Sequence, residues 1–81
     1  MHVKFYGTAK NVSGSLEYFC HRSGLNYHVD KDGELDDFTI TNFSDCCTIM
    51  SFIKDSIILY SANEGARIDI CAADFERMTV L

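Results

Sequence analysis

The sequence predicts an α+β fold: an antiparallel sheet of five or six strands, built as a meander plus a hairpin, packed against one main helix. Several short segments alternate polar with apolar residues, as half-buried strands do. One segment, at about residues 44–55, instead repeats its apolar residues with helical spacing. All five glycines fall between these segments, where turns are expected, and the 81 residues suffice for a single domain, 1–81.

The N-terminal part is expected to be strand, loop and strand. Residues 2–7, HVKFYG, alternate between apolar and polar side chains and predict the first strand. Residues 7–15 are rich in small and polar residues, which is typical of a loop. Residues 15–22 fit either a helix or a strand. A strand is favoured, because a turn at Ser23-Gly24 would place the apolar residues of three successive strands on one face.

Residues 28–38, HVDKDGELDDF, carry the clearest hairpin signal in the chain. Asp32-Gly33 lies between alternating residues, and a type I′ turn needs positive φ at both of its central positions. Pairing outward from this turn places His28 opposite Asp37 on a polar face, with apolar residues on the other face.

The same segment also matches the middle of an EF-hand calcium loop. Gly33 would be the invariant glycine, and Asp30 and Asp32 would supply the third and fifth positions. The first position then falls on His28 and the twelfth on Thr39, where the loop requires oxygen ligands from aspartate and glutamate. The flanking residues are strand-like rather than helical, so the hairpin is preferred over the calcium site.

The main helix is predicted at about residues 44–55. Its N-cap would be Ser44, and Asp45 and Lys54 would suit the two ends of the helix dipole. The residues at positions i, i+3, i+4 and i+7 of its apolar face are Cys46, Ile49, Met50 and Ile53.

A second hairpin is predicted around residues 63–65. Its matching apolar residues would be Ile58 and Tyr60 on one arm, and Ile68 and Ile70 on the other. Residues 73–81 fit either a short helix or a last strand, and the sequence leaves both alternatives open.

The charge of the chain is local. The formal net charge is −5, and residues 30–37 sum to −4, because they hold five acidic side chains and one lysine. Such a cluster repels nucleic acid and attracts a basic protein surface, for example that of a nucleic-acid-binding enzyme. The N-terminus lacks the apolar region of a signal peptide and no apolar run is long enough to span a membrane, so a cytoplasmic location with reduced cysteines is expected.

No constellation of catalytic residues is present in the sequence. Phosphate-binding glycine loops, a Gly-x-Ser-x-Gly elbow and a His-x-x-x-His pair are all missing. Cys20 and His21 are adjacent, and on a strand adjacent side chains point to opposite faces. We therefore expect a non-enzymatic protein without a cofactor.

Two classes of function follow from these observations. The first is a protein-binding module, of the kind found among anti-CRISPR, other phage anti-defence and immunity proteins, that uses the acidic hairpin to inhibit a nucleic-acid-handling enzyme. Its predicted contacts are Asp30, Asp32, Glu34, Asp36 and Asp37, with Phe19 and His28 as secondary contacts. Phe19 would lie on the face away from the helix, either exposed or covered by the second hairpin.

The second class is a small metal- or ligand-binding domain. His21, His28 and Asp37 would lie on one polar face and could supply three ligands to a zinc ion. A third alternative is a homo-oligomer in which exposed strand edges pair.

Overall fold

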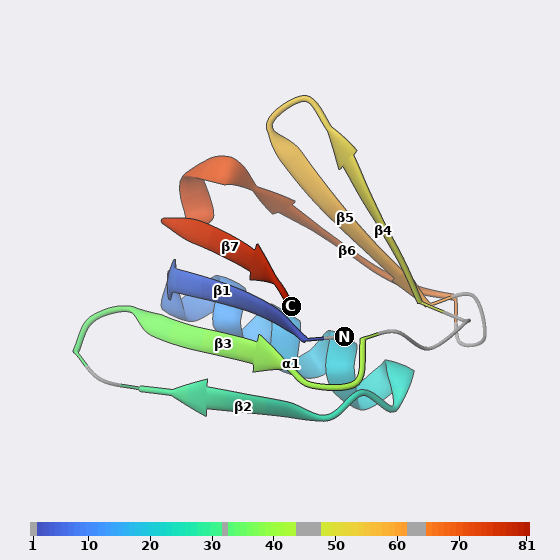
Figure 1. Cartoon of the computed structure of the whole chain (residues 1–81), viewed down its shortest axis with the longest axis horizontal. Coiled ribbons are helices and arrows are strands. Elements are labelled where there is room, and N and C mark those ends of the chain that lie inside the picture. The colour runs from blue at the N-terminus through green and yellow to red at the C-terminus, as the bar shows by residue number, and fades with distance from the viewer. Residues whose placement is uncertain (1, 32, 44–47, 62–64) are drawn as a thin grey trace.

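The computed structural model describes residues 2–31, 33–43, 48–61 and 65–81, and it confirms the α+β class. Within these ranges one α-helix packs against antiparallel strands that form two sheets instead of one (Figure 1). The first sheet has the order β2-β3-β1-β7, and the second has the order β4-β5-β6. The elements are β1 (Val3–Thr8), α1 (Lys10–Ser23), β2 (Tyr27–Asp30), β3 (Asp36–Ile40), β4 (Thr48–Ile53), β5 (Ser56–Ser61), β6 (Ala66–Cys71), the 3₁₀ turn η1 (Ala72–Asp74) and β7 (Arg77–Val80).

The helix lies in a different part of the chain from the one predicted. The prediction of a helix at about 44–55 is wrong, because β4 occupies residues 48–53 and pairs with β5 along its whole length. β4 is joined to β5 by a tight turn at Lys54–Asp55, in which Lys54 has a φ of 53°. β-branched residues at both ends of this segment favour a strand. The expected N-cap Ser44 and the Cys46-Cys47 pair lie outside the described residues.

Helix α1 replaces the loop and the strand that were expected before residue 24. Leu16, Phe19 and Cys20 follow the spacing i, i+3 and i+4, and all three are buried. Gly24 ends the helix in the left-handed conformation, with a φ of 69°, and its N–H donates to the Cys20 carbonyl oxygen. Glycine adopts this conformation without a steric penalty, so Ser23-Gly24 is a helix end and not the turn of a meander.

The predicted hairpin between residues 28 and 38 is confirmed as β2 and β3, but its register is shifted by two residues. Asp30 pairs with Asp37, and Val29 pairs with Phe38. A two-residue turn would instead have placed Val29 opposite Asp36. The longer connection at residues 31–35 allows apolar residues to face each other, and cross-strand apolar pairs stabilise a sheet.

Strand β1 lies in the middle of the first sheet and contains a β-bulge. Phe5 pairs with Phe38 but Thr8 pairs with Asp36, so Tyr6 and Gly7 together oppose the single residue Asp37. The bulge reverses the alternation of side chains, and Thr8 is therefore buried on the same side as Phe5.

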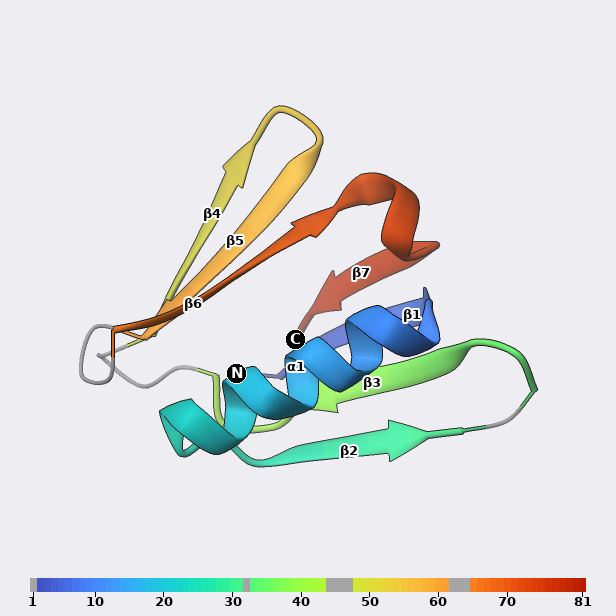
Figure 2. The same ribbon diagram turned by 180° about the vertical axis from the view of Figure 1, so that it is seen from behind.

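One core fills the space between the first sheet, α1 and the second sheet. Helix α1 covers one face of the first sheet, and β6 lies against the helix (Figure 2). The opposite face of the first sheet is turned toward the viewer in Figure 1, with no described element across it. The buried apolar residues are Val3, Phe5, Leu16, Phe19, Cys20, Leu25, Phe38, Ile40, Phe43, Ile57, Leu59 and Ile70.

The second predicted hairpin is confirmed as β5 and β6. Its apolar residues pair one position away from the expected register, as Ile57 with Ile70 and Leu59 with Ile68. Asn63 and Glu64, which were expected in the turn, lie outside the described residues. The C-terminal segment is a strand: β7 pairs with β1 at the edge of the first sheet. Among the described residues, no helix has the length and apolar character needed to cross a bilayer.

Candidate functional site

Two aspartates face each other on the uncovered face of the first sheet. Asp30 and Asp37 are directly opposite across β2 and β3. Phe38 and Val29 point into the core, so their neighbours along each strand point away from it. Like charges directly opposite on a sheet destabilise the pair. In the described part of the chain, neither aspartate forms an ion pair that would offset this repulsion.

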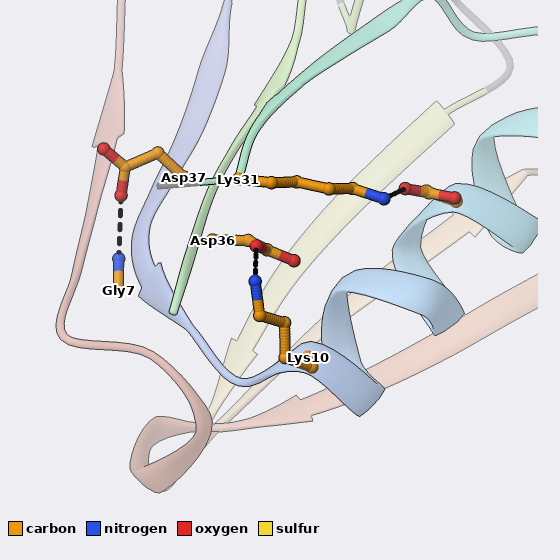
Figure 3. Close-up of polar contacts among 6 residues, drawn as sticks. Gly7, Lys10, Lys31, Asp36 and Asp37 are labelled. Atoms are coloured by element: carbon orange, nitrogen blue, oxygen red, sulfur yellow. Dashed lines mark hydrogen bonds and ion pairs between the residues drawn. The ribbon is translucent and has the colours of Figure 1, made fainter. Parts of the chain in front are cut away.

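The side chain of Asp37 is held by the bulge in β1. The Gly7 backbone N–H donates to Asp37 Oδ1 at 3.1 Å (Figure 3). This bond fixes where the carboxylate points but does not neutralise its charge. The bulge in β1 thus determines the position of the Asp37 carboxylate.

Asp36 is buried, and this differs from its expected role as a partner contact. Its side chain is 3% exposed and accepts a hydrogen bond from Lys10 Nζ of α1 at 2.5 Å (Figure 3). The hydrogen bond from Lys10 holds the pKa of Asp36 below its ordinary value, against the opposing effect of burial. Asp36 therefore joins β3 to the start of α1 and is not available to a partner.

This ion pair predicts a specific dependence of stability on pH. Because the pKa of Asp36 is lower in the folded chain than the ordinary value of about 4 in the unfolded chain, its stabilising effect is present above about pH 4. The effect is lost as the pH falls through the folded pKa. We expect Lys10→Met to lower the melting temperature at pH 7, and the difference from the wild type to shrink as the pH approaches 3.

Circular dichroism melts at several pH values measure this difference. Arg67→Met is the matched control, since it breaks the exposed ion pair of Arg67 with Asp69, and its effect at pH 7 should be smaller. A Lys10→Met difference that stays constant between pH 7 and pH 3 would contradict the assigned role of Asp36.

An exposed leucine lies beside Asp37. Leu35 is 41% exposed and lines a depression of about 560 Å³ together with Asp37 and Glu76. The depression continues over Tyr6, whose ring lies beneath the Arg77 guanidinium at 4.1 Å from the ring centroid. The term acidic surface is used below for Leu35 and four carboxylate residues: Asp30, which pairs with Asp37, the adjacent exposed Glu34, Asp37 itself and Glu76.

The sequence did not indicate Leu35 or Glu76 as site residues. A two-residue turn at Asp32-Gly33 would put Leu35 in a strand opposite Asp30, whereas it lies in the connection between the strands. Glu76 precedes β7, and its backbone N–H donates to the Tyr6 carbonyl oxygen at 2.8 Å, which brings it beside the bulge. An apolar residue within the acidic run GELDD was the available signal for Leu35.

The other predicted contacts occupy different environments. Phe19 belongs to α1 and is buried in one core with residues of β5 and β6, so the expectation that it lies on a face away from the helix is wrong. It is not exposed to a partner. His28 is exposed and pairs with Thr39 instead of Asp37. Glu34 is exposed, and Asp32 lies outside the described residues.

The three residues of the alternative metal site do not converge. His21 projects from α1, and its Nε2 lies 3.0 Å from the Tyr27 hydroxyl, on the helix side of the sheet. His28 and Asp37 lie on the opposite side. No group of three His, Cys, Asp or Glu side chains among the described residues is arranged to hold a metal ion.

The cysteine next to His21 is also not arranged for nucleophilic chemistry. Cys20 is buried in the core, and burial, followed by the negative charge of Glu17, raises the pKa of its thiol to about 12. A thiol with this pKa remains protonated at neutral pH and is a poor nucleophile.

No known protein family, characterised protein or solved structure matches this chain.

Proposed function

We propose that this protein is a non-enzymatic binding module whose acidic surface engages a basic surface of another protein. The observation that carries the proposal is the opposed pair Asp30 and Asp37, which has no ion-pair partner among the described residues. Bound cationic side chains would relieve the repulsion between the two carboxylates. Part of the free energy that this repulsion costs the free protein would therefore favour the complex.

The leucine within this surface supports binding to a protein. An apolar side chain surrounded by charged groups is a common arrangement in interfaces, where it is desolvated while the charges orient the partner. Leu35 is exposed and shares its depression with three charged residues, Asp37, Glu76 and Arg77. Lysine or arginine side chains of the partner would contact the carboxylates while an apolar contact covers the leucine.

The class of partner is proposed from charge and size. A small chain with a net charge of −5 is repelled by nucleic acid and attracted to proteins that bind it. By analogy with small acidic inhibitors, we propose that the partner is a nucleic-acid-handling enzyme in the cytoplasm, and that the protein acts as an anti-CRISPR, other phage anti-defence or immunity-type inhibitor. Occupying the enzyme's basic surface would block its nucleic acid.

The proposal is tested with a charge reversal on the acidic surface. Tagged wild-type protein is used to capture partners from an extract of the source cells, and the dissociation constant of the captured protein is then measured for each variant. We expect Asp30→Lys to weaken binding by about tenfold or more, and salt to weaken wild-type binding steeply.

The matched control is Asp55→Lys, which makes the same change in net charge at an exposed position in the β4–β5 turn. It should leave the dissociation constant within about twofold of the wild type, because the β4–β5 turn lies away from the β2–β3 hairpin (Figure 1) and salt screens distant exposed charges. The proposal fails if Asp30→Lys and Asp55→Lys bind the captured protein equally well.

A further inference from the structure

We propose that the groove between α1 and β6 binds an extended segment of a partner protein, which adds a strand to β6 and carries at least one acidic side chain. This site uses different residues from the acidic surface and does not depend on the function proposed above. Four observations support it: the free edge of β6, the residues that line the groove, the space above Gly14, and the local charge.

Strand β6 is an edge strand of the second sheet. It pairs with β5 on one side, and no other described strand pairs with it. In an antiparallel pair, hydrogen-bonded residues alternate with residues whose backbone groups point away from the partner strand. The Ala72 N–H donates to the Asp55 carbonyl oxygen at 2.7 Å, in the same register as the strand pairs. By this alternation the backbone groups of Arg67 and Asp69 point toward the free edge.

The groove follows this edge. It has a volume of about 690 Å³, and its β6 side is formed by the four consecutive residues 66–69. Successive strand residues point to opposite faces, so a groove lined by four in a row runs along the edge of the strand rather than over one face. A groove between a helix and a free strand edge is the setting in which extended peptides bind by strand addition.

The helix side of the groove leaves room for a ligand. Gly14 lies in the second turn of α1, and a Cβ atom built there would have no neighbour within 4 Å. One turn further along, Tyr18 is 66% exposed and lines the same groove. Tyrosine combines an apolar ring with a polar hydroxyl, and it is enriched in protein interfaces.

The charge of the groove selects an acidic ligand. Arg22 and Arg67 both line it, and one acidic residue, Asp69, lies beside them. Arg67 donates two hydrogen bonds to Asp69, at 2.8 and 3.0 Å, whereas Arg22 forms no ion pair with any described residue. In a chain whose net charge is −5, this is a local excess of positive charge. The Arg22 guanidinium is therefore the group that would pair with a carboxylate of the bound segment.

The test begins with a phage-displayed library of random nonapeptides, selected on the immobilised wild-type protein. We expect enriched peptides to contain aspartate or glutamate among β-branched and aromatic residues, the composition of a strand. One enriched peptide is then synthesised, together with two copies, one N-methylated at the odd-numbered residues and the other at the even-numbered residues. Methylation removes backbone donors, so one of the two alternating methylation patterns should lower affinity by about tenfold or more.

Variants of Gly14 locate the binding site. A Cβ atom at Gly14 would have no neighbour within 4 Å, so Gly14→Leu places a large side chain in the groove and should weaken binding by about tenfold or more. Gly14→Ala adds too little to block the groove and should bind like the wild type. Both variants favour the helix, so melting temperatures at or above that of the wild type would show that they fold. Asp30→Lys should leave peptide affinity unchanged, which separates this site from the acidic surface.

Two further variants test the charge. Arg22→Glu should weaken binding of the selected peptide, and Lys54→Glu, which makes the same change in net charge at an exposed turn, should not. The inference is overturned if no peptide is enriched, if Gly14→Leu binds as well as Gly14→Ala, or if neither methylation pattern reduces affinity. It is also overturned if the groove is closed in solution by a second copy of the chain, which Gly14→Leu would convert from a dimer to a monomer in sedimentation.

Discussion

Replacing Phe38 with alanine is expected to lower the free energy of unfolding by about 3–5 kcal/mol. Phe38 is completely buried in β3, between Val29 of β2 and Phe5 of β1. Its ring stacks on the Tyr27 ring at a centroid distance of 5.2 Å with an angle of 10° between the planes. The substitution removes the apolar contacts of the ring, leaves a cavity beside β1, and abolishes the stacking interaction, which alone contributes about 0.5–1.5 kcal/mol.

This loss is large for so small a domain. Typical stabilities correspond to about 0.05–0.15 kcal/mol per residue, so a chain of this length has few kcal/mol to lose before it unfolds. Urea unfolding followed by circular dichroism measures the change. Tyr18→Ala is the control, because it removes an aromatic ring that is 66% exposed, and it should change stability by less than about 1 kcal/mol. Equal effects of the two substitutions would contradict the assignment of Phe38 to the core.

The sequence predicted the fold class because alternation and turns are local signals. The first strand, the acidic hairpin and the second hairpin are all formed near the expected residues. The faces of the acidic hairpin were also predicted correctly despite the error in register. Every second side chain along a strand points to the same face of the sheet. A shift of two residues in the register therefore changes the cross-strand partners but not the faces.

The position of the helix could not be predicted from the same signals. A spacing of i, i+3 and i+4 occurs both in residues 16–20 and in residues 46–50, and short apolar patterns do not separate helix from strand. Tertiary contacts decide which segment forms the helix and which forms the strand. The helix at residues 10–23 covers the core face of the first sheet, whereas residues 48–53 pair with β5 along their whole length.

The site was predicted in part for a related reason. Charged residues can be read directly from the sequence, so the acidic run at residues 30–37 was predicted as a surface. The structure leaves Asp30 and Glu34 of this run exposed. The burial of Asp36 could not be predicted from the sequence, because it depends on the ion pair with Lys10. Lys10 is distant in sequence and belongs to a helix that was not predicted. Glu76 joins the surface through the pairing of β7 with β1, and long-range pairing leaves no local signal.

The bulge at Gly7 is the link between this fold and the acidic surface. Gly7 has a φ of 63°, a conformation that costs about 1–2 kcal/mol for a residue with a side chain. Its Cα also lies close to Glu76, so that an added Cβ would be 2.5 Å from Cγ and Cδ of that side chain. The close approach follows from two backbone hydrogen bonds, from Glu76 to Tyr6 and from Ala9 to Asp74.

We therefore expect Gly7→Ala to lower the free energy of unfolding by about 2 kcal/mol or more, through backbone strain and displacement of Glu76. Gly24→Ala separates the two causes, since Gly24 has a similar φ of 69° but no neighbour near the added Cβ, and it should cost only about 1 kcal/mol. Adding Glu76→Ala to Gly7→Ala removes the two clashing carbons and should bring the loss close to that of Gly24→Ala. Urea unfolding of the wild type, Gly7→Ala, Glu76→Ala and the double variant completes this double-mutant cycle, with Gly24→Ala measured beside them. If Glu76→Ala restores no stability to Gly7→Ala, the side chain of Glu76 is not held against the bulge, and it would then not belong to the acidic surface.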